Sequence, residues 1–174
     1  MGDYIAMVGL ANIVPILFSF LAVVIIYKGA KLVPQSDVYV IERFGKYTKT
    51  LNAGLNFIVP FLDRVAHRVS VLERQLAEFS ISVITRDNVE VGLEATVFFR
   101  VLDASRSVYR IRDINGALHT AATSIVRSAA GKLELDELQS SREKMSAEIA
   151  KNLQEAAEIW GIEITRTEIT LRFT

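Results

Sequence analysis

The hydrophobic pattern divides the chain into one long apolar run and a remainder with shorter, periodic segments. No charged residue occurs between Tyr4 and Tyr27. As an α-helix this run would be about 36 Å long, against a hydrocarbon core of ~30 Å in a bilayer. A proline interrupts its N-terminal half and predicts a kink. The pattern predicts one kinked membrane-spanning helix within residues 1–30, marked by Tyr4, Pro15, Phe18, Phe20 and Tyr27.

A cleavable secretory signal is the alternative interpretation of this run. It would need a basic start and a shorter apolar stretch of about 7–15 residues. Here Asp3 precedes the run, no Lys or Arg does, and the apolar stretch is longer. We therefore expect a retained anchor. Lys28 and Lys31 follow it directly, so the positive-inside tendency predicts a single-pass protein of the cell (inner) membrane with its C-terminal part in the cytoplasm.

Beyond the anchor, the first part of the chain has the period of β-strands. Val38–Phe44 and Val65–Val71 are predicted strands, rich in β-branched residues. Val89–Val101 has apolar residues at every odd position, which predicts a long half-buried strand. A polar turn at residues 86–88 precedes it, so Ile81–Ile84 should pair with it as a hairpin.

After residue 102 the period changes to that of helices. Asp103 and Asp113 are predicted N-caps of a short and a longer helix, and Ser140 or Ser141 is predicted to open a third. Gly131 and Gly161 should end the second and third. The predicted apolar faces are Ile114, Leu118, Ala121, Ile125 and Ala129 on the second helix, and Met145, Ile149, Leu153, Ala156 and Trp160 on the third.

The order of these elements predicts an α+β fold. Residues 162–173 return to strand character, and their apolar positions change face, which indicates a bulge or a strand buried on both sides. We therefore expect an anchor over 1–30 and a domain over 31–174. Its antiparallel, β-rich half would span 31–102 and face the membrane, and its α/β half would span 103–174.

Candidate chemistry is sparse. The chain has no cysteine, and it lacks the nucleotide-binding, serine hydrolase and zinc protease motifs. Its two histidines, His67 and His119, stand in contexts typical of surface positions. Basic residues do not gather with aromatic ones on a predicted sheet face, which argues against nucleic-acid binding. We expect no enzymatic activity, no cofactor, no metal and no nucleic-acid partner.

One apolar segment outside the anchor stands out. It contains Leu55, Phe57, Ile58, Val59, Phe61 and Leu62. It could pack beneath the first sheet, or it could enter the lipid leaflet beside the anchor. Residues 28–74 carry an excess of basic side chains, which suits an anionic lipid surface, although ordinary scatter of charge would explain it equally well.

Several ordered blocks resemble the SPFH (Band 7, prohibitin-homology) domain, and within that family stomatin and its bacterial relatives. The blocks are Lys31–Gln35, Glu42–Tyr47, Gly54–Arg64, Val83–Val89, Phe98–Val101, Leu133–Leu138, Arg142 and Trp160–Arg166. The resemblance implies a membrane anchor, a membrane-apposed β-rich half and homo-oligomeric rings or cages. It also implies partners such as membrane-bound AAA+ proteases and NfeD-like membrane proteins.

Two departures from the family pattern affect these expectations. The usual Pro-Gly turn is Ala53-Gly54 here, and Gly54 still supplies the permissive backbone. The long Ala/Glu/Lys-rich helix that follows the domain in relatives is not part of this chain, which runs to Thr174. We therefore expect cage assembly by this chain alone to be impaired.

The leading hypothesis is a non-enzymatic, membrane-anchored scaffold that organises membrane microdomains, binds lipids and copies of itself, and modulates membrane proteins or their quality control. The alternative is a regulatory adaptor of a membrane protease or channel that forms no cages. A membrane-tethered hydrolase is the third hypothesis. For the scaffold, charge placement suggests subunit contacts between one basic and one acidic set: Arg100, Arg110 and Arg112 with Glu134, Asp136 and Glu137.

Overall fold

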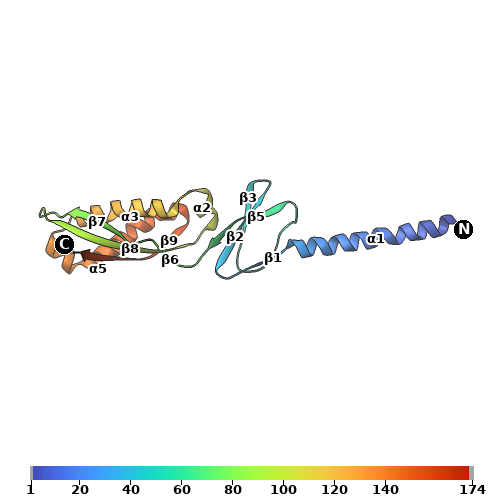
Figure 1. Ribbon diagram of the computed structural model, residues 1–174, viewed down its shortest axis with the longest axis horizontal. Helices are drawn as coiled ribbons and strands as arrows, with labels where there is room; N and C mark the ends of the chain where they lie inside the picture. The colour runs from blue at the N-terminus through green and yellow to red at the C-terminus, as the bar shows by residue number, and fades with distance from the viewer. Residues whose placement is uncertain (1, 173–174) are drawn as a thin grey trace. The chain divides into compact units, whose positions relative to one another are not determined.

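The computed structural model of the chain describes residues 2–172, with side chains described from Ile13 onward. The chain forms two compact units, Met1–Arg68 and Val69–Thr174. The first contains the N-terminal helix and short strands, and the second contains the long strands and the remaining helices (Figure 1).

The first unit is built from one long helix and two small sheets. Its elements are α1 (Gly2–Gly29), β1 (Ala30–Val33), β2 (Asp37–Arg43), β3 (Lys46–Leu51), β4 (Gly54–Phe57) and β5 (Asp63–Ser70). β1 pairs antiparallel with β4, and β2 lies between β3 and β5 in a three-stranded sheet. The predicted strands near residues 38–44 and 65–71 are thus confirmed as β2 and β5. The sequence patterns did not reveal β1, β3 or β4.

α1 covers the predicted membrane span, including Pro15. Tyr4 lies outside the residues whose side chains are described, whereas Phe18, Phe20 and Tyr27 are described and exposed. Across the described part of the chain, no helix offers a stretch long and apolar enough to cross a membrane. The structure therefore does not support the membrane-spanning helix, which stays a prediction from sequence.

The core of the first unit is small. Five buried side chains form it, from β1, β2, β3 and the residue after β4: Val33, Tyr39, Ile41, Leu51 and Ile58. Val65 of β5 packs against them. A core of this size removes little apolar surface from water, so polar contacts must contribute much of the local order.

The second unit is one antiparallel sheet covered by helices. Its elements are β6 (Arg74–Gln75), β7 (Phe79–Ile84), β8 (Glu90–Val101), α2 (Ala104–Tyr109), α3 (Ile114–Ala130), α4 (Leu135–Ser140), α5 (Arg142–Ala157), a 3₁₀ turn (Glu158–Trp160) and β9 (Ile162–Arg172). β8 pairs with β7 and β6 along one edge and with β9 along the other. α3 packs on α5, and both lie against the sheet (Figure 1).

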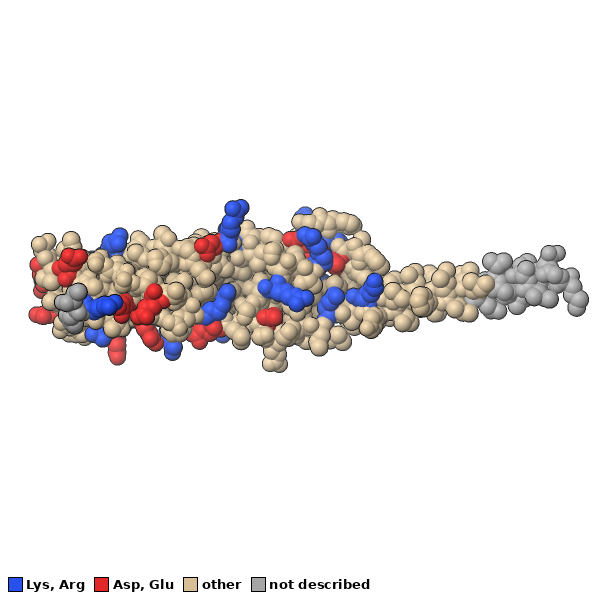
Figure 2. Space-filling model, viewed as in Figure 1, with Lys and Arg blue, Asp and Glu red and all other residues tan. Residues whose placement is uncertain are grey.

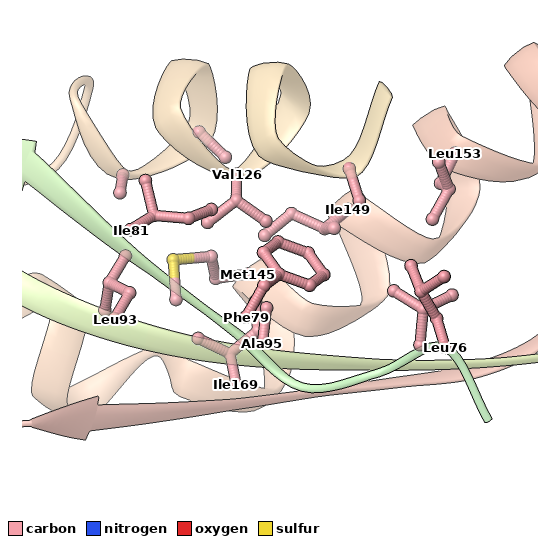
Figure 3. Packing of buried hydrophobic residues seen from close by; sticks show 14 of the residues in the cluster. Leu76, Phe79, Ile81, Leu93, Ala95, Val126, Met145, Ile149, Leu153 and Ile169 are labelled. Carbon is pink, nitrogen blue, oxygen red and sulfur yellow. The ribbon is translucent and has the colours of Figure 1, made fainter. Parts of the chain in front are cut away.

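The long strand has the predicted alternation. Every odd position of β8 from Val91 to Val101 is buried, while the even positions are half-buried or exposed. The predicted hairpin is also confirmed, since β7 pairs antiparallel with β8 from Ile84 opposite Glu90. Figure 3 shows this buried face against the helices, with Leu93 and Ala95 of β8 directed toward Val126, Met145 and Ile149.

The two predicted aspartate caps are confirmed. The Asp103 carboxylate accepts a hydrogen bond from the Arg106 amide (3.1 Å), and that of Asp113 accepts one from the Gly116 amide (3.0 Å). Each satisfies a backbone donor that the first turn of a helix leaves free.

The buried face of α3 differs from the predicted one in its middle. Leu118 and Ala129 are buried as predicted, but Ala121 and Ile125 are only partly buried. Ala122 and Val126, one residue further along the helix, are fully buried in their place. Alanine, valine and isoleucine all fit either face, so the sequence pattern does not separate them.

The third predicted helix is confirmed as α5, and a separate short helix, α4, precedes it. α4 begins after Glu134, whose backbone amide donates to the Glu137 carboxylate (2.9 Å) in a capping box, and α5 begins after Ser141. Gly161 ends the following turn with φ of 70°, as its position predicted. The predicted bulge is present in β9, because Phe98 and Phe99 of β8 pair with Arg166 and Ile164.

Candidate membrane-contact site

The end of α1 is held against the segment that follows β4. The Ile58 amide donates a hydrogen bond to the Gly29 carbonyl (2.9 Å). A β-carbon at residue 29 would lie 2.6 Å from the Ile58 carbonyl oxygen, so only glycine permits this approach. The contact places the apolar segment of residues 55–62 beside the end of the helix.

A buried carboxylate organises the loop of residues 59–63. The Asp63 amide donates to the Val59 carbonyl (2.9 Å), and the Asp63 carboxylate accepts from the Val59 amide (2.9 Å). Arg43, at the end of β2, donates two further hydrogen bonds to that carboxylate (2.7 and 3.2 Å). The Asp63 side chain is only 1% exposed. The Arg43 hydrogen bond, followed by that of the Val59 amide, holds the pKa of Asp63 below its usual value.

This loop presents apolar side chains to the outside. Phe61 is 82% exposed, and Leu55 and Phe57 on β4 are more than half exposed. Val59 and Leu62 are also exposed, whereas Ile58 is buried in the core of the first unit. The predicted loop residues are therefore divided: Ile58 anchors the segment, and the other five face outward. We name these five, with Leu32 and Phe44, the apolar surface.

Two phenylalanines of the apolar surface occupy unusual backbone positions. Phe44 (φ 51°) and Phe61 (φ 72°) both adopt the left-handed region, and both are over 80% exposed. For a bulky residue this conformation is strained, and an exposed phenyl ring gains nothing from burial within the chain. Arg43 and Asp63 connect the two turns, since Arg43 precedes Phe44 and Asp63 follows Phe61 by two residues. The fold therefore holds two rings outward at a cost in strain.

Basic side chains surround the same region. Lys28 at the end of α1, Lys31 on β1, and Arg64 and Arg68 on β5 line a groove with Phe61. The Lys28 ammonium lies 5.7 Å from the centre of the Phe61 ring. Figure 2 shows basic side chains on the strands next to α1, while residues 13–27 of the helix carry no charge. An apolar surface bordered by cations is the pattern expected of contact with a lipid leaflet.

Sequence reasoning missed Phe44 and Leu32 as members of this surface. Phe44 is the last residue of a β-rich block, and its neighbour Gly45 (φ 78°) marks a tight turn. A large apolar residue next to such a turn is the only signal that could have identified it. Leu32 lies on a strand too short for its alternation to be read.

The residues predicted to make subunit contacts lie in the second unit. Within the described residues, no hydrogen bond or ion pair joins the basic set to the acidic set. Arg100 instead pairs with Glu163, and Glu134 pairs with Arg86 (2.5 Å). The Arg110 guanidinium donates to the Ile159 carbonyl (3.4 Å). Arg112 and Asp136 are exposed, so they are the members best placed to meet another chain.

The remaining candidate chemistry has structural roles. Asp113 caps α3, and His119 packs its ring 4.7 Å from Phe79. His119 also borders a shallow depression on α3 with Ser124 and Arg127. In the range that the structure describes, no cluster of three His, Cys, Asp or Glu side chains could hold a metal ion.

Comparison with known proteins identifies the family. The profile described as "SPFH domain / Band 7 family" matches residues 31–171, which is most of the chain. The chain belongs to the SPFH domain / Band 7 family. The match begins within β1, directly after α1, and continues into β9, so this SPFH domain includes the strands of the first unit and the whole described sheet of the second.

Named and unnamed relatives support the same assignment. The SPFH chain is 34% identical over 137 residues to human stomatin-like protein 2, mitochondrial, covering 79% of this chain and 38% of that protein. It is 36% identical over 139 residues to an uncharacterized protein of Schizosaccharomyces pombe, covering 80% and 39%. An uncharacterized protein of Mycobacterium tuberculosis is 32% identical over 148 residues, covering 85% and 39%. The chain thus spans about two fifths of the length of these curated relatives.

Proposed function

We propose that this SPFH chain is a non-enzymatic membrane scaffold that attaches to lipid through α1 and the apolar surface, and associates side by side with its own copies. One observation carries the proposal. The first unit directs large apolar side chains outward beside the end of an apolar helix, and holds two of them in strained backbone positions. Family membership supports it, since the resemblance to stomatin implies the same mode of action.

The mechanism follows from two kinds of contact. α1 provides apolar area that loses water on entering lipid, at about 25 cal/mol per Å². Phe44 and Phe61 add a second contact, because exposed aromatic rings favour the boundary between lipid and water. Two separate points of attachment fix the orientation of the first unit at the membrane, which a single flexible anchor would not do.

Lipid contact of the apolar surface can be measured with single-cysteine variants, because the natural chain has no cysteine. Phe61→Cys in the full chain is labelled with an environment-sensitive fluorophore and placed in liposomes containing nitroxide lipids. We expect quenching by shallow nitroxides. Ile84→Cys is the control, since Ile84 is also a large apolar residue that is mostly exposed (62%) but belongs to the second unit. Equal quenching at both positions would refute a specific contact.

The orientation of α1 is tested in the same way. We propose that α1 crosses the inner membrane and leaves the SPFH domain in the cytoplasm, as Lys28 and Lys31 predict. A cysteine in place of exposed Ser140 should react with an impermeant reagent only from the cytoplasmic side. A cysteine at position 3 should react only from the other side. Reaction of both from one side shows that the helix lies on the membrane rather than across it.

Side-by-side association is tested by charge reversal. We propose that Arg112 of one copy meets Asp136 of the next. Arg112→Glu or Asp136→Arg should reduce the oligomer seen by native mass spectrometry of detergent-extracted protein, and the double variant should restore it. A monomer in every variant, with the natural chain also monomeric, contradicts the scaffold. Recovery of a membrane protease or an NfeD-like protein after crosslinking, in place of copies of the chain, favours the adaptor role.

A further inference from the structure

A groove in the first unit lies at the junction of α1 with the strands. Its volume is about 640 Å³. The walls come from three elements: Tyr27 and Lys28 from the end of α1, Lys31 from β1, and Arg64 and Arg68 from β5. Pro60 and Phe61 of the loop close one side. Arg64 and Arg68 are four residues apart on one strand, so their side chains leave the same face of the sheet.

The groove carries an excess of positive charge. Among the described residues that line it, four are cations and Asp63 is the single acidic residue. The Arg43 guanidinium, which does not line the groove, already balances the charge of Asp63 through two hydrogen bonds. Arg64 donates one hydrogen bond to Glu42 (2.9 Å) and keeps other N–H donors, since a guanidinium has five. The Arg68 guanidinium stacks 5.1 Å from the Tyr39 ring, which fixes its position and leaves its edge available.

The position of the groove along the chain places it at the level of lipid headgroups. Tyr27 is the last residue of the uncharged run, and Lys28, which lines the groove, is the first charge after it. When α1 is in lipid, this transition from apolar to charged residues coincides with the transition from hydrocarbon to headgroup. Phe61 is exposed on the same groove and would face the glycerol and upper acyl region.

We propose that this groove binds the phosphate group of an anionic membrane lipid. Guanidinium groups match the geometry of phosphate oxygens, and lysine adds compact charge at the rim. Two arginines from one strand and two lysines from the preceding helix and strand surround the space from different sides. The proposal rests on membrane attachment of the chain and adds to it a specific ligand site.

The test measures binding of a short-chain phosphatidylglycerol to the full chain in detergent, by native mass spectrometry with titration. We expect Lys28→Gln/Lys31→Gln to weaken binding roughly 20-fold or more, because each basic residue near an anionic surface contributes a factor of about five. Arg68→Gln should weaken it further. Lys28→Arg/Lys31→Arg should retain binding, which separates loss of charge from loss of fold.

The matched control removes the same charge elsewhere. Lys144→Gln/Lys151→Gln changes two exposed lysines of α5 and should leave binding unchanged. Equal weakening in both double variants would show a general charge effect and overturn the site. Unchanged binding in Lys28→Gln/Lys31→Gln and Arg68→Gln also overturns it.

Competition identifies the source of the phosphate. Inorganic phosphate at millimolar concentration should not displace the lipid if the acyl-glycerol part contributes to binding. Displacement at low concentration assigns the same groove to a soluble phosphate compound. If the groove binds no lipid phosphate but the chain is still a membrane scaffold, quenching at position 61 and the oligomers would persist in the variants that remove the groove cations.

Discussion

The two units of the chain place their large apolar side chains differently. In the second unit, they gather between one sheet and the helices that cover it, in a continuous core that includes Leu93, Phe99 and Ile149. In the first unit, five buried residues form the core, while Leu55, Phe57 and Phe61 face outward. Burial of apolar side chains within the chain stabilises the second unit, whereas the first unit leaves large apolar side chains exposed beside a small core.

The largest expected effect is on the core of the second unit. Leu93 is fully buried, so Leu93→Ala should lower the free energy of unfolding by about 3–5 kcal/mol. Trp160 is the only tryptophan and packs against this core, so its fluorescence during urea unfolding reports this unit. Ile84→Ala on β7, where the side chain is 62% exposed, is the control and should change stability by less than about 0.5 kcal/mol.

The next effect concerns the polar support of the first unit. Asp63→Ala removes the acceptor of three charge-assisted hydrogen bonds, two of them donated by the Arg43 guanidinium, and should destabilise this unit by about 2–3 kcal/mol. Fluorine NMR of fluorotyrosine at buried Tyr39 reports its unfolding, while Trp160 should register little change. If both probes report the same loss of stability, the two units unfold together and do not differ in what stabilises them.

Acid should act on the same carboxylate. The folded state lowers the pKa of Asp63, so its contribution is complete above the ordinary aspartate value of about 4 and is lost as pH falls below it. Between pH 5 and pH 3, the Tyr39 signal should show unfolding of the first unit at lower urea concentration. Asp63→Asn cannot ionise and should lose most of this dependence. Any pH dependence of unfolding that remains in Asp63→Asn arises from other titratable groups.

A smaller effect is expected at a helix cap. Asp113→Ala removes the hydrogen bond to the Gly116 amide and should cost about 1 kcal/mol, seen by Trp160 fluorescence. The exposed Asp136 is the control, because the structure gives its carboxylate no capping bond. Asp136→Ala should cost only a few tenths of a kcal/mol, through the helix dipole.

The smallest expected effect is an increase in the stability of the first unit. Phe61→Asn places a residue that tolerates the left-handed region at φ 72° and should stabilise the first unit by about 0.5–1 kcal/mol. The same variant should bind liposomes less well. Phe57→Asn on β4, where the backbone is extended, should share the weaker binding without the gain. Loss of stability in Phe61→Asn would mean that the ring packs within the chain.

Strong periodicity made the second unit predictable. β8 alternates over its whole length, and the caps at Asp103 and Asp113 combine a polar residue with an apolar run. The prediction of the buried face of α3 failed in part, because the helix has small apolar residues on two adjacent faces. Ala121 and Ala122 are the same residue type, so the sequence does not show which of them is buried, and packing against the sheet and α5 determines it.

The first unit was less predictable for a different reason. β1 and β4 have four residues each, and their pairing joins segments separated by β2 and β3, so no local pattern reveals it. The sequence revealed the apolar segment of residues 55–62, but it did not show which side chain of the segment points into the core. Ile58 is buried because its amide binds Gly29 at the end of α1, a contact that the sequence of the segment does not encode.

The hydrogen-bonded loop of residues 59–63 has a consequence for the proposed lipid contact. Its backbone is already fixed by Asp63 before any membrane is present. The conformational entropy of ordering this loop is therefore lost during folding and not on association, where it would subtract from affinity. In the proposed membrane contact, Phe61 approaches lipid on a backbone that is already ordered, so only its side-chain rotamers remain to be restricted. A chain with a loosened loop should keep the same ring and yet dissociate faster.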